Sequence, residues 1–465
     1  MSDKKPNPLV YEQKNAYTVL DKSETDKAYA FAEEYKGFIN AAKTERESAI
    51  YAENAAKKAG FTPLDNNERL TPGSRVYRNF GGKLIMLAVI GKSGADSGFN
   101  IAAAHIDAPR LDLKQLPLYE SEEVAYFKTH YYGGIKKFQW VTLPLAIHGY
   151  CVRADGSSVA FSIGENEDEP AFFISDLLPH LGKDQLKKTL AEAFTGESLN
   201  LIVGTSPSQD ADAASKYKLR VLEILSEKYG ITEEDFLSSE IEVVPAGRAR
   251  DAGFDGSLIG AYGHDDRVCA YPALSALLSL SGTPDKTAVV ILADKEEIGS
   301  EGVSGMQSRA FERFTAELLR KAGSRLDLDE AYERSFCLST DVCNALDPSF
   351  MEVSEKINAA KLNHGIGILK FTGSGGKSSS SDASAETVAK VRALFRENGV
   401  LWQMGELGKV DQGGGGTVAK YMANRNIQTI DAGVPVLSMH APWELIAKLD
   451  LYMTYKAILA LFSGQ

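Results

Sequence analysis

Cysteine is scarce in this chain, which has four cysteines among 465 residues. Cys151, Cys269, Cys337 and Cys343 are too few and too widely spaced for a disulfide scaffold, and they form no C-x-x-C zinc pattern. Structural disulfides also belong to oxidising compartments rather than to the cytosol. We therefore expect reduced, buried thiols in a cytoplasmic protein.

Long apolar runs and an excess of positive charge are missing as well. No run approaches the roughly 20 apolar residues that cross a membrane, and the opening segment MSDKKPNP lacks the apolar core of a signal peptide. The net charge of -12 opposes nucleic acid and anionic membranes as main partners. We expect no nucleic-acid partner and no membrane partner.

The remaining composition is that of an ordinary globular protein. Hydrophobic residues make up 44% and charged residues 25%, and the length allows two or three domains around a large core. Strand and helix patterns alternate at both ends of the chain, which predicts one α/β domain formed by residues 1–113 and 256–465. Residues 114–255 are rich in strand signals and poor in reactive side chains, which predicts an inserted β-rich domain.

Hydrophobic periodicity and turn residues predict the individual elements. Residues 24–58 are expected to form one or two helices, and Asp155-Gly156 is typical of a hairpin turn. Further helices are expected at 184–194, 213–229, 268–280 and 310–321, and from His440 onward. Strands are expected at 81–90, 99–104, 241–244, 289–293, 335–340, 427–430 and 434–439. In the insert, Tyr131, Tyr132, Phe138 and Trp140 form a small core or, alternatively, a contact surface.

Glu296 and Glu297 stand just beyond the apolar strand predicted at 289–293. Two adjacent carboxylates can point in different directions, so that one binds a metal while the other handles a proton. A solvated acidic turn is the alternative, because glutamates usually lie at the surface. The pair gains importance because other segments end in similar side chains.

His105 and Asp107 follow another predicted strand and lie two residues apart, on one face of extended chain. This spacing suits a metal-bound imidazole whose tautomer is fixed by a carboxylate, although a histidine satisfied inside the core is the alternative. Asp265 and Asp266 open a predicted helix, where helix capping is the alternative. Open α/β sheets bind ligands outside the carboxyl ends of their strands. Five side chains can therefore converge on two zinc ions about 3.5–4 Å apart, namely His105, Asp265, Glu297, Asp341 and His440.

Two glycine-rich segments also require an interpretation. Residues 373–382 suggest a phosphate-binding loop, but Phe371 stands where the Walker pattern requires glycine. Residues 411–416 contain four consecutive glycines. Both segments are therefore expected to be flexible polar loops.

Several motifs occur in a characteristic order along the chain: AAAHIDAPRLD, GHDDR, DKEEIGSEG, STDVCNA, and GGTVAK through VLSMHAPWE. In this order they resemble the aspartyl aminopeptidase and vacuolar aminopeptidase I family of dinuclear zinc aminopeptidases, in particular a bacterial branch. The resemblance implies an α/β fold with a mixed sheet flanked by helices, the co-catalytic zinc peptidase fold, and an inserted β-rich dimerisation domain at 114–255. The tail departs from the eukaryotic pattern, in which an arginine precedes the glutamate that Trp443 precedes here, and this puts the substrate preference in question.

The resemblance also implies the metal site. His105 and Asp341 would hold one zinc ion, Glu297 and His440 would hold the other, and Asp265 would bridge them. In related folds the peptide bond after this aspartate is cis. Mn²⁺ and Co²⁺ are alternative metals.

The implied reaction is removal of the N-terminal residue from a peptide by a bridging metal-bound hydroxide. Glu296 would be the general base, and Asp107 would orient a metal ligand. The substrate needs a free N-terminus, and its first residue is acidic (Asp or Glu) or neutral in different family members. Lys377 or Lys409 would pair with an acidic side chain, although each is alternatively a solvated loop charge.

Family members assemble through the insert into dimers that build a tetrahedral dodecamer, and the resemblance implies such a homo-oligomer. The segment ISDLLPHL matches a family segment whose histidine reaches into the partner's active site, and His180 occupies that position. There, an imidazole would donate a hydrogen bond to the substrate carbonyl. The alternative is a histidine packed at the insert's own surface.

Two other functions use the same residues. A metal-dependent deacylase or carboxypeptidase on a related fold would have the same ligands. A non-catalytic assembly protein would keep the fold but is expected to lose at least one ligand, and here all five ligands and Glu296 are present.

Overall fold

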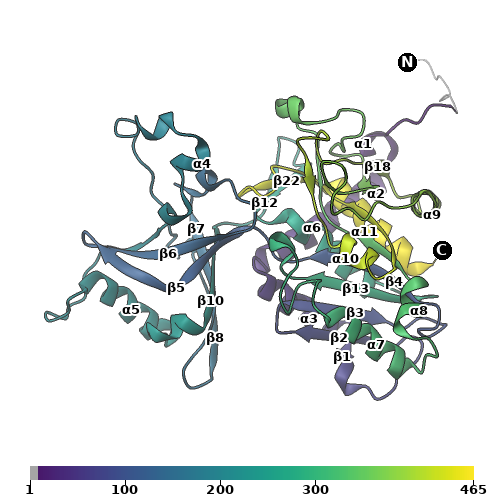
Figure 1. Cartoon of the computed structure of the whole chain (residues 1–465), viewed down its shortest axis with the longest axis horizontal. Coiled ribbons are helices and arrows are strands. Elements are labelled where there is room, and N and C mark those ends of the chain that lie inside the picture. Colours follow the sequence, from purple (N-terminus) through teal and green to yellow (C-terminus); the bar gives the residue numbers. More distant parts are fainter. Residues whose placement is uncertain (1–8, 465) are drawn as a thin grey trace.

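The computed structural model describes residues 9–464 and has two lobes joined by a narrow waist (Figure 1). The polar opening segment, residues 1–8, lies outside the described residues. Among residues 9–464, no helix combines the length and apolar character that crossing a membrane requires. All four cysteines are buried and free, as the sequence predicts.

The larger lobe contains a mixed nine-stranded sheet whose four central strands, β13, β4, β14 and β20, run parallel. In order across the sheet its strands are β1 (Thr62–Pro63), β2 (Arg75–Phe80), β3 (Leu84–Val89), β13 (Thr287–Ala293), β4 (Phe99–His105), β14 (Phe336–Ser339), β20 (Gln428–Gly433), β16 (Ile366–Leu369) and β18 (Trp402–Met404). Every residue of β13 is buried, as expected for a parallel strand covered on both faces. The predicted strand at 289–293 is therefore confirmed.

Helices cover both faces of this sheet because side chains alternate along each strand. Val290 of β13 packs into a core with α2 (Lys22–Ala41), α3 (Glu45–Lys58), α6 (His264–Leu278) and α11 (Lys448–Ser463). Val289 points to the other core, formed with α7 (Ala310–Ala322), α8 (Leu328–Glu333) and α10 (Ala419–Ala423). The short α1 (Ala16–Val19) and α9 (Ala385–Glu397) complete the helices of this lobe within the described residues. The predicted fold class is confirmed.

The smaller lobe is built on a six-stranded antiparallel sheet formed by residues between 110 and 245. In order its strands are β8 (Ser158–Ile163), β7 (Leu145–Val152), β10 (Ser239–Pro245), β5 (Arg110–Ser121), β6 (Val124–Tyr132) and β9 (Leu201–Gly204). The α5 helix (Lys216–Tyr229) packs on it, and β7 and β8 form the hairpin predicted at Asp155-Gly156. Trp140 is fully buried in this lobe, whereas Tyr131 is exposed. The exact domain limits stay a prediction.

A smaller five-stranded sheet lies at the waist and carries several of the turns that matter for chemistry. Its strands are β11 (Arg250–Ala252), β12 (Leu258–Ala261), β22 (Glu444–Ala447), β21 (Pro435–Leu437) and β15 (Cys343–Asn344). The chain turns after β12 to reach Asp265, and it turns between β21 and β22 at His440. This sheet therefore brings segments that are far apart in the sequence to one place.

Two predicted helices are wrong. At 184–194 the structure has only a 3-10 turn (Gln185–Lys187) and the four-residue α4 (Leu190–Ala193), because Leu186 and Leu190 remain exposed and provide no packed face. His440 opens a turn rather than the C-terminal helix. Glu444 is buried and begins β22, and α11 begins only at Lys448.

Candidate active site

Neighbouring parallel strands bring the predicted residues to one edge of the large sheet. His105 is the last residue of β4 and lies beside Ala293, the last residue of β13, so the Glu296–Glu297 turn begins next to it. Asp341 follows β14, which pairs with the other side of β4. The carboxyl ends of three adjacent strands thus supply four of the side chains, as expected for an open α/β sheet.

The Asp265 carboxylate lies between two histidines. Its Oδ1 is 3.2 Å from His105 Nε2, and its Oδ2 is 3.1 Å from His440 Nε2. On the first side, Asp341 Oδ1 lies 3.8 Å from His105 Nε2, and on the second side Glu297 Oε2 lies 3.5 Å from His440 Nε2. The five side chains therefore form two adjacent groups that share one carboxylate.

The alternative role of Asp265 as a helix cap does not match this geometry. Gly263 occupies the N-cap position of α6, and Asp265 has a non-helical backbone conformation. The peptide bond between Asp265 and Asp266 is cis, as the resemblance implies. Both aspartates are buried, and Asp266 accepts a hydrogen bond from the His105 backbone N–H at 3.2 Å.

The chemistry of this donor set fits divalent cations. His105, Asp265 and Asp341 are each at most 7% exposed, and Glu297 Oε1 is buried without a hydrogen-bond partner among the described residues. Buried carboxylates without a partner are costly, and imidazole nitrogens with carboxylate oxygens are the ligands that zinc prefers. His105, Asp265 and Glu297 offer ligand atoms that all lie within 4.8 Å of one another, as do His105, Glu296 and Asp341.

The pKa shifts of the cluster also indicate that its carboxylates are stabilised by positive charge. Burial tends to raise the pKa of Asp265, but the imidazoles of His105 and His440 outweigh it and hold that pKa well below its usual range. Burial tends to lower the pKa of His440, yet Asp265 and Glu297 raise it to about 10. Burial raises the pKa of Glu296 to about 7, with the charges of Asp107 and Asp265 adding to the effect. Bound cations would replace the protons that hold these side chains together.

Asp107 connects the elements of the site. Its carboxylate lies 3.2 Å from His105 Nδ1 and accepts hydrogen bonds from the backbone N–H groups of Glu296 and Glu297, each at 3.2 Å. It also accepts from the Tyr132 hydroxyl at 2.8 Å. With the proton on Nδ1, the lone pair of His105 Nε2 points toward Asp265. The predicted orienting contact is thus present, and it extends to the glutamate turn.

Three contributions to the site were not predicted from the sequence. Tyr132, expected in a small core or a contact surface, reaches Asp107 from β6. The next residues form a turn in which Gly134 O accepts from His440 Nδ1 at 3.0 Å, and a Cβ on Gly133 would lie 3.3 Å from Glu297. The turn after β6 is therefore built to fit against two of the candidate ligands. The Gly133-Gly134 pair is the feature of the sequence from which this turn could have been predicted.

Glu444 is the third missed residue. This buried carboxylate accepts hydrogen bonds from the backbone N–H groups of His440 at 2.7 Å and Asp265 at 3.1 Å. It joins two candidate ligands that are far apart in the sequence. Its position four residues after His440 in VLSMHAPWE was the available signal.

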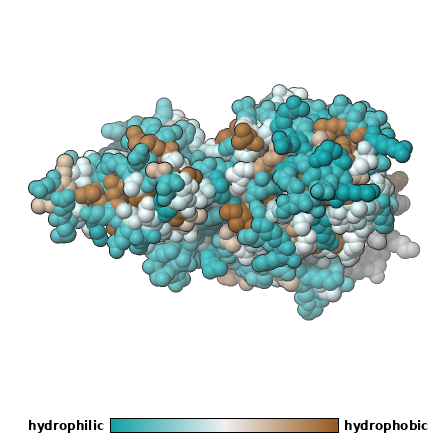
Figure 2. All heavy atoms as spheres, turned by 90° about the horizontal axis from the view of Figure 1, so that it is seen from below, coloured by the Kyte–Doolittle hydropathy of each residue, from teal (hydrophilic) through white to brown (hydrophobic). Residues whose placement is uncertain are grey.

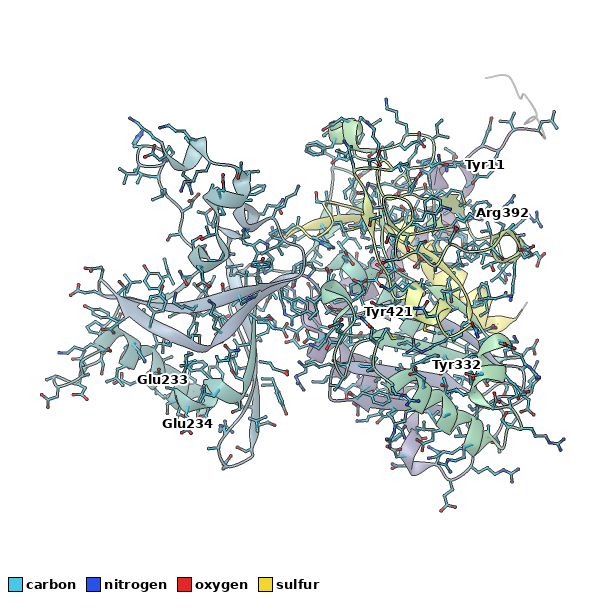
Figure 3. All side chains as sticks on the ribbon, viewed as in Figure 1. Tyr11, Glu233, Glu234, Tyr332, Arg392 and Tyr421 are labelled. Carbon is cyan, nitrogen blue, oxygen red and sulfur yellow. The ribbon has the colours of Figure 1, made fainter. Side chains whose placement is uncertain are left out.

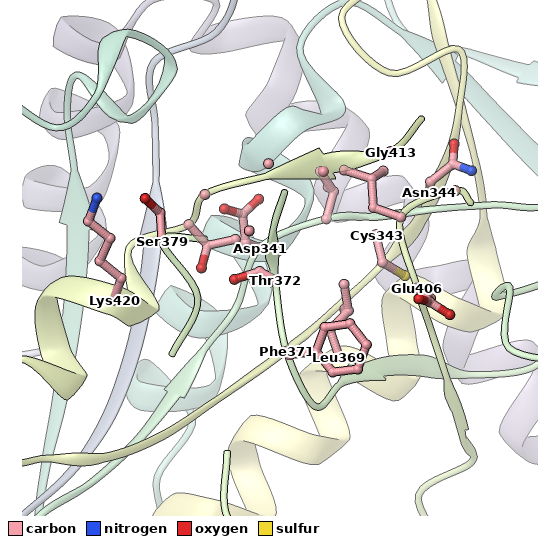
Figure 4. A pocket seen from close by; sticks show the side chains of 18 of the residues that line it. Asp341, Cys343, Asn344, Leu369, Phe371, Thr372, Ser379, Glu406, Gly413 and Lys420 are labelled. Carbon is pink, nitrogen blue, oxygen red and sulfur yellow. The ribbon is translucent and has the colours of Figure 1, made fainter. Parts of the chain in front are cut away.

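A cavity of about 850 Å³ opens over the cluster and is bordered by Asp265, Glu296, Glu297, Asp341 and His440. Leu369 and Phe371 contribute apolar surface, and the two glycine-rich segments form a further wall (Figure 4). These segments pair through the short strands β17 (Gly373–Ser374) and β19 (Gly414–Gly415). They do not form a phosphate loop.

Three lysines border the same cavity. Lys377 is paired with Asp382 at 3.1 Å, whereas Lys409 and Lys420 have no ion pair within the described part of the chain. Tyr421, next to Lys420 on α10, donates a hydrogen bond from its hydroxyl to Gly299 O at 2.9 Å (Figure 3). Because Gly299 ends the turn that carries Glu296 and Glu297, α10 also helps to hold that turn.

His180 is not part of this cluster. It is exposed, does not border the cavity, and has no recorded hydrogen bond within residues 9–464. A role for it in the chain's own site finds no support in this geometry, and its role across a subunit interface stays a prediction.

Comparison with known proteins agrees with the geometry. The model of the family described as "Aminopeptidase I zinc metalloprotease (M18)" matches residues 38–462. A Clostridium acetobutylicum protein named "Probable M18 family aminopeptidase 1" is 47% identical over 455 residues, which cover 97% of this chain and 98% of the relative. The crystal structure of an M18 family aminopeptidase from Thermotoga maritima superposes with a TM-score of 0.94 at 45% identity, covering 98% of this chain and 100% of that one.

The fold extends to more distant structures. A chain from the structure of the S. cerevisiae mApe1 dodecamer superposes with a TM-score of 0.75 at 21% identity, covering 93% of this chain and 96% of that chain. With a family model that matches nearly the whole chain and relatives well above 40% identity, the resemblance noted in the sequence is confirmed: this chain belongs to the M18 family of zinc aminopeptidases, which are metallopeptidases.

Proposed function

We propose that this protein removes the N-terminal residue of peptides with two zinc ions per subunit. His105 and Asp341 would hold one ion, Glu297 and His440 the other, and Asp265 would bridge them. The observation that carries the proposal is the Asp265 carboxylate, whose two oxygens lie 3.2 and 3.1 Å from the Nε2 atoms of two histidines. When bound, two such cations lower the pKa of a shared water and polarise a carbonyl.

Glu296 is the proposed general base and acid. It borders the cavity beside the candidate ligands, and its Oε2 lies 3.9 Å from His105 Nε2. In this role its carboxylate takes a proton from the attacking water and later gives it to the leaving amine, as amide hydrolysis requires. Asp107 would keep Glu296 in place, because it accepts the hydrogen bond from that residue's backbone N–H.

Recognition of the substrate follows from the charges around the cavity. The carboxylates of the cluster favour a free α-ammonium group over a blocked amine, which selects an aminopeptidase over a deacylase or carboxypeptidase. Lys409 and Lys420 border the same cavity without carboxylate partners among the described residues. We propose that they favour an acidic side chain, Asp or Glu, at the substrate's N-terminus, and that Lys377 contributes less because Asp382 neutralises it.

The insert, residues 114–255, is the proposed dimerisation domain. The segment around His180 exposes Leu177, Leu178 and Leu181, each at least 50% exposed, and apolar patches mark the surface of the smaller lobe (Figure 2). Exposed apolar side chains gathered in one segment are typical of an interaction surface. Together with the yeast dodecamer of the same fold, they support dimers that assemble into a tetrahedral dodecamer. His180 would then reach the partner's active site.

The role of Glu296 has a direct test. Glu296→Gln removes the acid–base group but keeps the side-chain size, so we expect turnover to fall by at least about 10²-fold with zinc content unchanged. The exposed Glu301→Gln on the same loop is the matched control and should behave like the wild type. The test is steady-state kinetics together with metal analysis of the same samples. Near-normal turnover of Glu296→Gln would show that Glu296 is not the general base.

The bridging role of Asp265 predicts an unequal loss of metal. Asp265→Ala should lose both zinc ions, whereas His440→Ala or Asp341→Ala should lose mainly one, because only the bridge serves both positions. Zinc per subunit, measured after dialysis against a weak chelator, distinguishes the variants. Loss of one ion in all three would contradict the bridge.

The substrate proposal predicts a pattern across peptides. Peptides that begin with Asp or Glu should be cleaved faster than those that begin with Ala or Leu, and N-acetylated peptides should not be cleaved. Lys409→Met and Lys420→Met should each reduce the acidic preference about fivefold, the effect of an ion pair near 1 kcal/mol. Lys356→Met, an exposed lysine outside the cavity, should leave it unchanged. Equal rates on acidic and neutral peptides would refute the preference.

The proposed position of His180 can be tested by mixing inactive subunits. If His180 acts across the interface, a heterodimer of His180→Ala and Glu296→Gln subunits has one site lacking both groups and one complete site, so mixing should restore activity. If it acts within its own subunit, every site still lacks one group. Activity no higher than that of either parent, with heterodimers demonstrated by native mass spectrometry, would exclude the role in the partner's site.

A further inference from the structure

Asp431 is a buried carboxylate that the proposed chemistry does not use. It lies on β20 directly beside Ser339 of β14, and it is 1% exposed. Its Oδ1 accepts a hydrogen bond from the Thr417 hydroxyl at 2.8 Å. The hydroxyls of Ser339 and Ser381 face the same carboxylate but fall short of hydrogen-bond geometry. Three hydroxyls from three separate segments thus gather around one acidic side chain.

Two of these hydroxyls belong to the glycine-rich walls of the cavity. Ser381 stands at the end of residues 373–382, and Thr417 directly follows residues 411–416. Both segments border the cavity, and they pair with each other only through Gly373–Gly415 and Ser374–Gly414. Glycine-rich chain loses much conformational entropy when it is ordered, so a short ribbon of this kind needs attachment elsewhere. Asp431 holds the end of the second segment through its hydrogen bond with Thr417, and Ser381 at the end of the first segment faces the same carboxylate.

The same carboxylate is connected to the turn that carries Glu296. The Thr417 hydroxyl, which donates to Asp431, also accepts from the backbone N–H of Ala419 at 3.3 Å, where α10 begins. Two residues later Tyr421 donates to Gly299 O, at the end of the glutamate turn. Asp431 is therefore at the base of a continuous set of contacts that runs along the cavity wall.

We propose that Asp431 is a positioning residue that fastens both glycine-rich segments to the sheet and thereby sets the shape of the substrate cavity. It acts through Thr417 and Ser381 rather than by touching the substrate. The inference rests on the proposed binding of the peptide's N-terminal residue in this cavity. The inference requires that removing the Asp431 carboxylate raises KM more than it lowers kcat.

The chain provides a direct probe of the two segments. Lys377 lies within the first segment and Lys409 just before the second, and both are exposed, so trypsin can report how firmly each segment is held. Asp431→Ala should accelerate cleavage after both lysines. Thr417→Val should accelerate mainly the cleavage after Lys409, and Ser381→Ala mainly that after Lys377. This assay does not depend on catalysis, so it stands apart from the proposed function.

Kinetics provide the second measurement. Removing a buried hydrogen-bonded group typically costs enough for about a tenfold effect, so Asp431→Ala should raise KM about tenfold and change kcat less than about threefold. Asp450→Ala is the matched control, because Asp450 is also a fully buried carboxylate on the same lobe but accepts from the Asn363 and Gly365 backbone N–H groups away from the cavity. It should lower thermal stability without changing KM or the cleavage after Lys377 and Lys409.

The outcomes separate a positioning role from simple core stability. Faster cleavage at both lysines with a raised KM in Asp431→Ala, absent in Asp450→Ala, supports the proposal. Unchanged cleavage and KM in folded Asp431→Ala overturns it, as do equal effects in Asp450→Ala. If Asp431→Ala does not fold, Thr417→Val and Ser381→Ala decide, and wild-type behaviour of both overturns the proposal. Faster cleavage without any change in KM would show that the segments are fastened but do not shape the binding site, and this also overturns it.

Discussion

Repulsion among buried carboxylates is the constraint on which the rest of this structure depends. Asp265 and Glu297 lie within 4.8 Å of His105 and of each other, and Glu296 and Asp341 form a second group of the same size around His105. Among the described residues, the imidazoles of His105 and His440 are the ones paired with these carboxylates. Such an arrangement is unfavourable without positive charge, whether protons on the histidines or divalent cations. Membership of a zinc aminopeptidase family explains why the charge is concentrated there. The surrounding fold must hold these mutually repelling carboxylates in place.

Hydrogen bonds from backbone N–H groups and contacts from the smaller lobe hold the carboxylates in place. Asp107 accepts hydrogen bonds from the backbone of Glu296 and Glu297, and Glu444 accepts from the backbone of His440 and Asp265. Three of the five candidate ligands are therefore held through their main chain. The end of β6 and the turn after it add Tyr132 and Gly134, which makes the smaller lobe part of the site. A partly buried ionic network joins the smaller lobe to the larger one: His148 of β7 lies 2.7 Å from Glu47 of α3 and 2.9 Å from Glu165, and Lys43 lies 2.7 Å from Glu165. Relative movement of the lobes would disturb these contacts and the site together.

The cavity wall is built differently from its floor. The floor rests on the ends of packed parallel strands, whereas one wall consists of glycine-rich segments with few apolar contacts of their own. A wall of this kind needs attachment points, which Thr417, Tyr421 and Asp431 supply through side-chain hydrogen bonds. The strand ends of the floor suit chemistry that requires fixed distances between the reacting groups.

The sequence by itself determined the α/β class, the central strands and the family, because buried parallel strands have continuous apolar runs and the motifs carry reactive side chains just beyond them. It also identified His105, Asp265, Glu296, Glu297, Asp341 and His440 as a set. Only the tertiary structure decided that Asp265 faces both histidines and that Tyr132, Gly134 and Glu444 belong to the site. It also decided that 184–194 forms only short helical turns and that the C-terminal helix begins at Lys448 rather than at His440. These features depend on contacts between residues far apart in the chain. Local periodicity carries no information about which distant backbone N–H a carboxylate meets, or whether an apolar face finds a partner to pack against.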